Sequence, residues 1–299
     1  MKYNRKKILP IIALAISTIG VGSAIFFVKI SEVDATSTLM LRMFIAGGIA
    51  YALGSSRISN EFIEPQRSTK KILILLILSG IASTIDLLSN HWAVSFTSMA
   101  NTAVLMNLSP FFVAFLSYIF FKEKLNAHQT FSLIICITGA SILVFSKNEG
   151  IDFSNNSLIG DLLALNSALF YAIYFLLIRE LRGHISTRKI IVWHSFTCGL
   201  LLLPISLTSN SPIFPSTFNG WVTIALLAFI SQLLGHGLMT YALKYVDVVL
   251  ASISTLAKPI VAIMLGYLFF DEKLLPLQWF GVFIVLSGIG WYRRSSSSK

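Results

Sequence analysis

Long apolar stretches constrain the fold of this chain more than any other feature of its sequence. Ten of them, each about 20 residues long, follow one another along the chain and are separated by short polar connectors. They run over 8–28, 36–54, 72–92, 98–121, 128–146, 158–178, 189–207, 220–243, 248–270 and 276–292. A helix of this length spans the hydrocarbon core of a bilayer and satisfies its own backbone hydrogen bonds. We therefore expect an all-α integral membrane protein with ten transmembrane helices.

The composition agrees with a chain whose solvent is lipid. Hydrophobic residues make up 55% of the 299 residues and charged residues only 12%, about half of the usual charged share in a soluble domain. The alternating pattern of a membrane β-barrel does not occur in the sequence. Basic residues precede the first stretch, as in a signal peptide, but its length and the nine stretches that follow favour a retained helix.

The charge pattern predicts the orientation in the membrane. The net charge is +10, but the basic residues lie in short connectors without nucleic-acid-binding motifs, so we expect no nucleic-acid partner. Alternate connectors, counted from the N-terminus, carry 18 of the 23 Lys and Arg residues, and the connectors between them carry only Lys29, Lys147 and Lys273. The positive-inside rule then places both termini in the cytoplasm, and we expect the membrane to be the bacterial inner (plasma) membrane.

The sequence also contains an internal repeat. A shift of 149 residues aligns 92–141 with 241–290 without gaps. The matched residues include Pro110 with Pro259, Tyr118 with Tyr267, Glu123 with Glu272, Lys124 with Lys273, Gln129 with Gln278, and Gly139 with Gly288. Each half holds five spans, an odd number, so the halves enter the membrane in opposite directions. We expect two inverted five-helix repeats, 1–147 and 148–299, with a site near the membrane midplane between them.

Two matched segments carry a resemblance to a known family. SPFFVAFLSYIFFKEKL at 109–125 and KPIVAIMLGYLFFDEKL at 258–274, together with the five-plus-five duplication, resemble the EamA family of the drug/metabolite transporter superfamily. The resemblance covers essentially the whole chain. It implies a transporter of small organic molecules such as amino acids and their metabolites, in which the fifth and tenth helices are peripheral and the first, third, fourth, sixth, eighth and ninth surround a cavity.

Charged residues inside the spans are candidates for a substrate site, because a charge in hydrocarbon is costly. Lys258 lies about 15 Å into the ninth span, and Asp86 about 21 Å into the third. Lys258 could contact an anionic group of the substrate, most simply an amino-acid carboxylate, or be held by a buried partner for packing alone. Asp86 could bind a substrate amine, carry a coupled proton, or form a fixed ion pair with Lys258 or Arg42.

Uncharged and titratable side chains complete the set of candidate substrate-binding residues. Asn90 is four residues from Asp86 and therefore shares its helical face. His236 titrates near neutrality and could relay protons, although a lone histidine more often serves packing. The remaining candidates are Asn101, Asn107, Asn166, Tyr174, Gln232 and Thr255.

Prolines interrupt the fourth and ninth spans. Each proline lacks an N–H and frees the carbonyl four residues earlier, at Met106 for Pro110 and at Thr255 for Pro259. Broken backbone near the midplane is tolerated only beside protein or a watery cavity. Pro110 and Pro259 are therefore candidates for helix breaks and gating along the pathway, and a simple packing kink is the alternative.

Motifs of the main catalytic classes do not occur in the sequence. It has no phosphate-binding loop, zinc-protease motif or nucleophile elbow, so we expect no cofactor, no metal and no enzymatic activity. The favoured function is a secondary transporter that moves a small metabolite, most simply an amino acid or amino-acid-like compound, by alternating access through a midplane cavity. A membrane-embedded enzyme and a channel or scramblase-like protein are the alternatives.

The expected partners are a small-molecule substrate and the lipid bilayer. Because both repeats lie in one chain, a monomer is sufficient for a pathway. A homodimer is the alternative.

Overall fold

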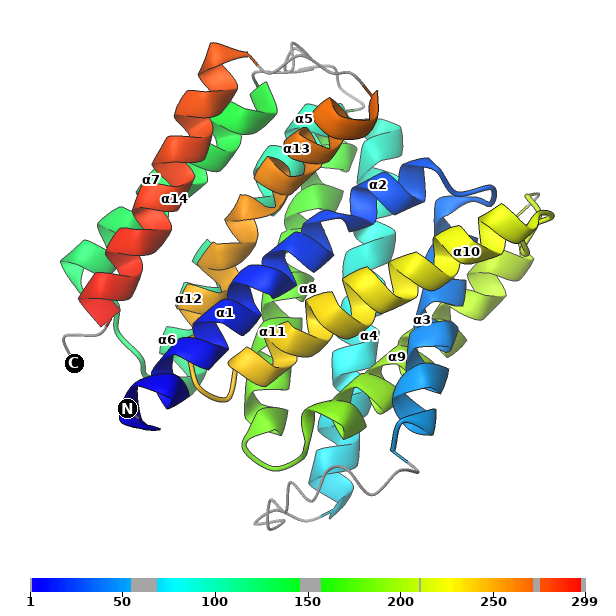
Figure 1. Cartoon of the computed structure of the whole chain (residues 1–299), viewed down its shortest axis with the longest axis horizontal. Coiled ribbons are helices and arrows are strands. Elements are labelled where there is room, and N and C mark those ends of the chain that lie inside the picture. Colours follow the sequence, from blue (N-terminus) through cyan, green and yellow to red (C-terminus); the bar gives the residue numbers. More distant parts are fainter. Residues whose placement is uncertain (1, 55–68, 146–156, 210, 271–274, 297–299) are drawn as a thin grey trace. The chain divides into compact units, whose positions relative to one another are not determined.

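The regular structure of the chain is helical (Figure 1). The computed structural model describes residues 2–54, 69–145, 157–209, 211–270 and 275–296, and within these ranges it contains helices and no strands. Nine helical stretches of this described part are long and apolar enough to cross a membrane. They are Ile8–Lys29, Ala35–Ala52, Thr69–Phe96, Asn101–Phe121, Ala127–Phe145, Leu158–Arg182, Thr187–Leu207, Phe218–Ala242 and Val248–Phe269. The prediction of an all-α fold built from membrane-spanning helices is confirmed at this level.

The last predicted span, 276–292, is also helical but is not among the nine. It forms α14 (Pro276–Ser296), whose apolar residues are interrupted by Gln278 and three glycines and which ends near Arg293 and Arg294. These residues lower its mean hydropathy, so the number of ten membrane helices stays a prediction. Lys147, Glu272 and Lys273 lie outside the described residues.

Several predicted spans consist of more than one helix. The first is divided into α1 (Lys2–Gly22) and α2 (Ala24–Lys29) at Ser23, whose hydroxyl donates a hydrogen bond of 2.8 Å to the carbonyl of Gly20. Such side-chain bonds to the preceding turn compete with the helical pattern and bend it. The eighth comprises α10 (Phe218–Leu227), the π-helix η1 (Ala228–His236) and α11 (Gly237–Ala242).

The proline-containing spans are broken as well. The fourth comprises α5 (Met99–Met106) and α6 (Ser109–Phe121), separated by Asn107 and Leu108. The ninth comprises α12 (Val248–Ser254), the 3-10 turn η2 (Thr255–Ala257) and α13 (Lys258–Phe270). In both spans one residue separates the break from the proline, which cannot donate a backbone hydrogen bond.

The chain forms two compact units, and each is assembled from two separate stretches of sequence. Unit 1 contains residues 1–84 and 177–246, and unit 2 contains residues 85–176 and 247–299. The boundary passes through α4 (Thr69–Phe96) and α8 (Ser157–Arg182), so each of these helices contributes to both units.

Two packed helix pairs organise unit 1. Helix α3 (Ala35–Ala52) lies beside α9 (Thr187–Leu207), and α1 lies against η1 and α11. The α1 crossing is closest at Gly20, where an added Cβ would lie 2.6 Å from the carbonyl oxygen of Ile230 and 3.0 Å from the Cα of Gly235. Only glycine allows two backbones to approach this closely.

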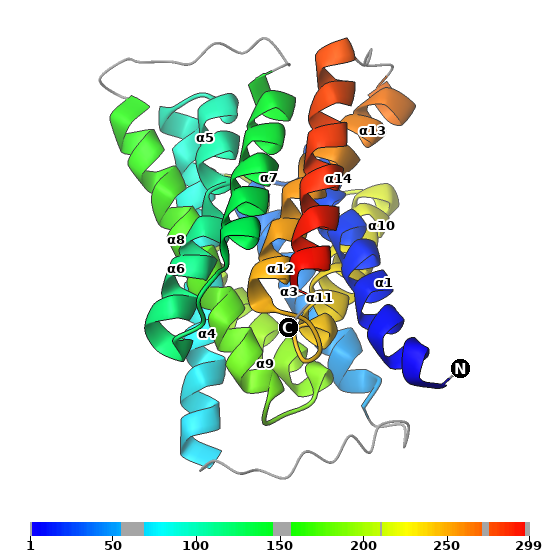
Figure 2. The ribbon, with the colours of Figure 1, turned by 90° about the vertical axis from the view of Figure 1, so that its left-hand side faces the viewer.

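Unit 2 contains a long pair formed by α7 (Ala127–Phe145) and α14, which lie side by side in both views (Figures 1 and 2). An added Cβ at Gly139 would lie 2.6 Å from Ile284 Cγ2, so this pair also depends on small residues at its contact. Helix α7 begins with a capping box, because the Asn126 side chain accepts from the Gln129 amide and the Gln129 side chain accepts from the Asn126 amide. Both helices also contact η2 (Thr255–Ala257), the turn that directly precedes Lys258.

Candidate functional site

Lys258 lies at a helix break and faces an aromatic ring. It is the first residue of α13, directly after η2, and its Nζ lies 4.8 Å from the ring centroid of Tyr171 on α8. A cation over an aromatic face at this distance is attracted by the ring quadrupole. The Tyr171 ring is itself stacked on Tyr174, with centroids 6.2 Å apart. Both tyrosines are buried, whereas the lysine is partly exposed.

The break before Lys258 is covered by hydroxyl groups. Thr255 Oγ1 donates to the carbonyl of Ser252 at 2.6 Å, and Ser254 Oγ donates to the carbonyl of Leu250 at 2.9 Å. Irregular backbone within a membrane span requires such internal partners. Thr255, a predicted site residue, therefore has a local structural role at the break and also lies in the turn that carries Lys258.

The side chain of Asp86 contacts α8, the helix that Lys258 also contacts. It is buried on α4, and its Oδ1 accepts a hydrogen bond of 2.5 Å from the hydroxyl of Ser167 on α8. Ser167 lies one helical turn before Tyr171 on α8. The Asp86 carboxylate also acts electrostatically on the Lys258 ammonium. One acid and one base are thus arranged along one stretch of α8 in unit 2.

Amide side chains surround this pair. Asn166 Nδ2 donates to the Ser89 hydroxyl at 2.8 Å, which joins α8 to α4. Asn90 Nδ2 contacts the sulfur of Met106, the last residue of α5 before the break. Asn107 follows in that break, and its buried Nδ2 has no hydrogen-bond partner among the described residues. The break in the fourth span therefore contains a buried amide donor, Asn107 Nδ2, that a ligand could satisfy.

Asn101 belongs to a different cluster of unit 2. Its Nδ2 donates to Thr97 Oγ1 at 3.1 Å and to Asp161 Oδ1 at 3.3 Å, and the Thr97 hydroxyl donates to the same carboxylate oxygen at 2.8 Å. Asp161 lies in the first turns of α8, six residues before Ser167. These bonds join the end of α4 and the start of α5 to the start of α8, so Asn101 has an evident structural role.

The two remaining predicted site residues lie in unit 1. Gln232 and His236 are both in η1, and the side-chain oxygen of the buried Gln232 has no hydrogen-bond partner within the described residues. Unit 1 also buries Arg42 near His194, and the two side chains interact electrostatically. A functional role for Gln232 and His236 stays a prediction.

Some residues of the cluster have no distinctive sequence signal. Ser167, Ser89 and Asp161 hold predicted site residues in place, yet serine is common in membrane helices and Asp161 lies near a span end. The spacing of four residues between Ser167 and Tyr171 is the one regularity that points to a shared face. Their partners depend on how α4 and α8 are rotated, which the apolar pattern does not specify.

Comparison with known proteins assigns this chain to a family. The chain matches the model of the EamA-like transporter family twice, over residues 8–145 and 158–293. The pseudopaline exporter CntI of Pseudomonas aeruginosa is 25% identical over 200 residues, which cover 66% of this chain and 67% of the exporter. An uncharacterized transporter of Archaeoglobus fulgidus is 26% identical over 277 residues, 93% of each chain.

Two further likenesses agree with this assignment. A probable amino-acid metabolite efflux pump of Escherichia coli is 23% identical over 208 residues, which cover 66% of this chain and 68% of the pump. One solved crystal structure matches with a TM-score of 0.79 at 14% identity, over 99% of this chain and 98% of that one, which shows the fold alone. Because the family model covers nearly all of the sequence and the named relatives are transporters, exporters or efflux pumps, this integral membrane protein is a transporter rather than an enzyme and belongs to the EamA-like transporter family.

Proposed function

We propose that the chain is a secondary transporter of a small zwitterionic metabolite, most simply an amino acid or an amino-acid-like compound, and that it works by alternating access. The observation that carries this proposal is the placement of Lys258 and Asp86 along the same stretch of α8, inside spans of the membrane. A zwitterion presents one anionic and one cationic group, and this pair complements both. Charged residues within membrane spans commonly mark substrate pathways.

The partners of the two charged residues are suited to exchange with a substrate. Lys258 faces the ring of Tyr171, a cation–π contact worth about 0.5–2 kcal/mol, and a substrate carboxylate offers a stronger charge-assisted bond. Asp86 accepts from Ser167, which is uncharged, and its carboxylate is the type of acceptor that binds a substrate amine. Lys258 then binds the carboxylate, and Asp86 binds the amine or carries a coupled proton.

The surrounding polar residues contribute the remaining contacts in this proposal. The buried amide of Asn107 is a donor beside the broken fourth span, and Tyr174 supplies an aromatic wall through its stacking on Tyr171. The other residues proposed for substrate contact or proton movement are Asn90, Asn101, Asn166, Thr255, Gln232 and His236. Pro110 and Pro259 give the fourth and ninth spans the breaks at which their halves can pivot.

We propose further that the fold consists of ten membrane helices in two inverted repeats, 1–147 and 148–299. The α7–α14 contact supports this arrangement because it is symmetric under the shift of 149 residues. Gly139 faces Ile284, and its counterpart Gly288 faces Ile135, the counterpart of Ile284. Reciprocal contacts of this kind are the property of elements related by a two-fold axis. A monomer then contains a complete pathway, without a nucleic-acid partner.

The charge distribution supports the proposed orientation. The 18 basic residues on alternate connectors favour cytoplasmic termini in the bacterial inner (plasma) membrane. The membrane-embedded enzyme is the weaker alternative, because the family is one of transporters. A channel or scramblase-like activity is the second candidate, and kinetics separate it from a carrier.

Counterflow in proteoliposomes tests the proposed function. The full chain is reconstituted, and uptake of labelled amino acids is measured with and without unlabelled solute inside the vesicles. A carrier accelerates labelled uptake when the far side is loaded, whereas a channel does not. If no accepted solute shows this acceleration, the carrier proposal is wrong.

Two variants test the site with the same assay. Lys258→Ala and Asp86→Asn each remove a charge-assisted contact worth about 1.5–3 kcal/mol, so KM should rise about 10- to 100-fold. Lys244→Ala is the matched control, because Lys244 is exposed and lies in a connector. Wild-type KM and wild-type pH dependence in both site variants would exclude the assignment of Lys258 and Asp86.

A further inference from the structure

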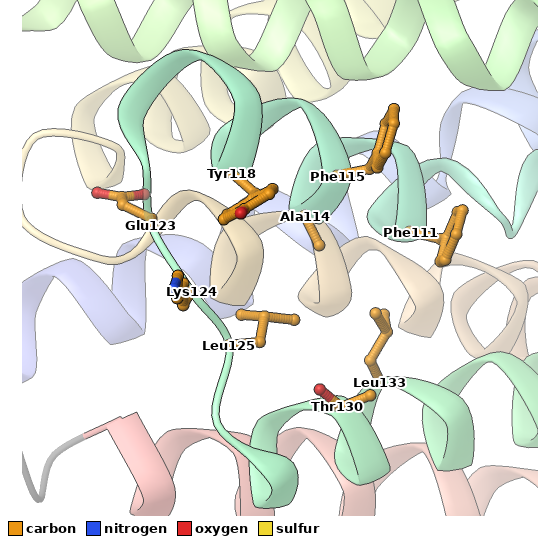
Figure 3. A pocket seen from close by; sticks show the side chains of 9 residues that line it. All are labelled: Phe111, Ala114, Phe115, Tyr118, Glu123, Lys124, Leu125, Thr130 and Leu133. Atoms are coloured by element: carbon orange, nitrogen blue, oxygen red, sulfur yellow. The ribbon is translucent and has the colours of Figure 1, made fainter.

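A groove on unit 2 is lined by residues other than those proposed for transport. It runs between α6 and α7, and the connector 122–126 closes one end of it (Figure 3). Its volume is about 400 Å³, which falls in the range of small-molecule pockets. The side chains that form its walls are mainly those of Phe111, Phe115 and Tyr118 from α6, Leu125 from the connector and Leu133 from α7. The interior of the groove is therefore apolar.

The aromatic side chains of the α6 wall of the groove are exposed. Phe111 and Phe115 are each 52% exposed and Tyr118 is 47% exposed, although all three lie on a membrane-spanning stretch. In a membrane such side chains meet acyl chains rather than water. A hydrocarbon chain is thus the occupant that the walls of the groove accept.

The end of the groove is basic. Lys122 caps α6 in the left-handed conformation (φ 59°), a position that glycine usually occupies. Lys122 and Lys124 are exposed, whereas the Glu123 carboxylate accepts a hydrogen bond of 2.7 Å from Ser117 on α6. Glu123 and Lys124 both line this end of the groove (Figure 3). The lining acid is thus bonded to α6, Lys124 lines the groove, and the exposed Lys122 lies two residues before Lys124 in the connector.

The residues at the neighbouring end of α14 are typical of the membrane interface. The Ser295 hydroxyl donates to the Asn126 side chain at 3.1 Å, so the last turn of α14, which contains Arg293 and Arg294, lies next to the connector. Trp291 in the same turn packs edge-on against Phe131, with ring centroids 5.4 Å apart. Tryptophan beside basic residues is typical of the interface between hydrocarbon and headgroups.

We propose that this groove binds an anionic phospholipid of the cytoplasmic leaflet. One acyl chain lies against Phe111 and Phe115, and the phosphate lies at Lys122 and Lys124. A zwitterionic lipid would bring its own cation towards these lysines, and a soluble anion would leave the apolar walls uncovered. The leaflet follows from the proposed orientation, whereas the lipid class follows from the groove alone.

Lipid binding to the purified full chain tests the proposal. The protein in mild detergent is titrated separately with dioleoyl phosphatidylglycerol, dioleoyl phosphatidylcholine and glycerol 3-phosphate, and bound species are quantified by native mass spectrometry. Phosphatidylglycerol should bind most tightly. Lys122→Gln combined with Lys124→Gln should weaken it about 25-fold, from about fivefold for each lysine near a phosphate. Lys244→Gln removes the same charge elsewhere and should leave binding unchanged.

A second variant tests the apolar part of the site. Ala114 lines the groove, so Ala114→Trp should fill it and weaken phosphatidylglycerol binding at least tenfold, whereas Val222→Trp on the exposed face of α10 should not. If Ala114→Trp does not fold, the lysine pair still decides. Equal binding of the two lipids, binding of glycerol 3-phosphate as tight as that of the lipid, or equal losses in Lys244→Gln would each overturn the proposal.

Discussion

The side chain of Lys258 illustrates how a charge within a membrane-spanning stretch can be held by an aromatic ring. Its ammonium lies over the ring of Tyr171, and Asp86 acts on it electrostatically while accepting from Ser167. A cation–π contact holds the ammonium in one place at a modest energy. In the proposed function the ring positions the lysine, and a substrate carboxylate can displace it from the ring.

Substitution of Tyr171 separates the ring from its hydroxyl. Tyr171→Phe keeps the aromatic face and should leave the KM for substrate within about threefold of wild type. Tyr171→Leu removes the face and should raise KM about 5- to 30-fold, because up to about 2 kcal/mol of cation–π attraction is lost. Transport kinetics in proteoliposomes measure both values.

The control for Tyr171 is the thermal stability of the solubilised variants. Because leucine also removes packing, only a KM effect that persists at a temperature where both variants are fully folded supports a positioning role. Equal KM values for the phenylalanine and leucine variants would show that the ring does not position Lys258.

At the residue scale, charge within an apolar stretch is the signal that singles out two candidates for the site. Lys258 and Asp86 are recognisable because few charges occur inside spans, and the structure places both beside α8. Asn101 satisfied the same polar criterion, yet it joins helix ends through Thr97 and Asp161. The apolar pattern gives the depth of a residue but not its rotation about the helix axis, and the rotation determines its partners.

Helices differ in how much of their form the sequence reveals. Pro110 and Pro259 indicate the breaks in the fourth and ninth spans, because the lost N–H has a local structural consequence. The π-helix η1 at Ala228–His236 contains no proline, and its wider turn depends on packing rather than on a residue type. The kink at Ser23 needs a specific rotamer that donates to Gly20, which one serine among many does not predict.

The carboxylate of Glu32 binds the residues that immediately precede α10. Glu32, between α2 and α3, accepts from the backbone amides of Ser216 at 3.0 Å and Thr217 at 3.1 Å, and also from the Thr217 hydroxyl. Thr217 in turn caps α10 by accepting from the amide of Gly220 at 3.0 Å. The hydrogen bond from the Thr217 side chain, followed by that from its backbone, lowers the pKa of Glu32 below its ordinary value of 4.5.

The lowered pKa of Glu32 gives a pH dependence with a definite sign. The ionised form makes the bonds, so their contribution is complete above pH 4.5 and is lost as the pH falls through the lower folded-state pKa. Hydrogen exchange of the segment 211–220 should therefore become less protected in acid. Glu32→Gln should reduce protection several-fold at neutral pH and remove the acid-dependent change.

Glu180→Gln is the control for this experiment, since Glu180 lies on α8 and pairs with His184 four residues later. It should leave protection of the segment 211–220 unchanged at every pH. Identical exchange in wild type and Glu32→Gln across the acid range would show that the carboxylate does not hold the start of α10.

At the scale of the whole molecule, hydropathy predicted the long helices well because a bilayer imposes one length on every span. Hydropathy does not predict the grouping of helices into units, since each unit combines two separate stretches of the sequence. Such grouping depends on contacts like those of Gly20 with Gly235 and of Gly139 with Ile284. Glycines are visible in a sequence, but their partners across the fold are not.

Orientation is the property of the whole molecule that the charges predict most directly. Lys29 and Lys244 are both exposed, and the proposed topology places them on opposite sides of the membrane. Cys136 and Cys198 are free and fully buried, so the unmodified chain should give a low background in thiol labelling. Lys29→Cys should react with a membrane-impermeant maleimide in intact cells, and Lys244→Cys should react only after the membrane is opened.

Neither substitution should itself invert the chain, because each removes one positive charge from an asymmetry of 18 to 3. The unmodified protein serves as the control for background labelling of Cys136 and Cys198. Labelling of Lys244→Cys but not Lys29→Cys in intact cells would place the termini outside. Labelling of both would mean that the chain inserts in two orientations, a result that a charge difference of this size opposes, since a mixed population requires the two sides to attract nearly equal numbers of basic residues.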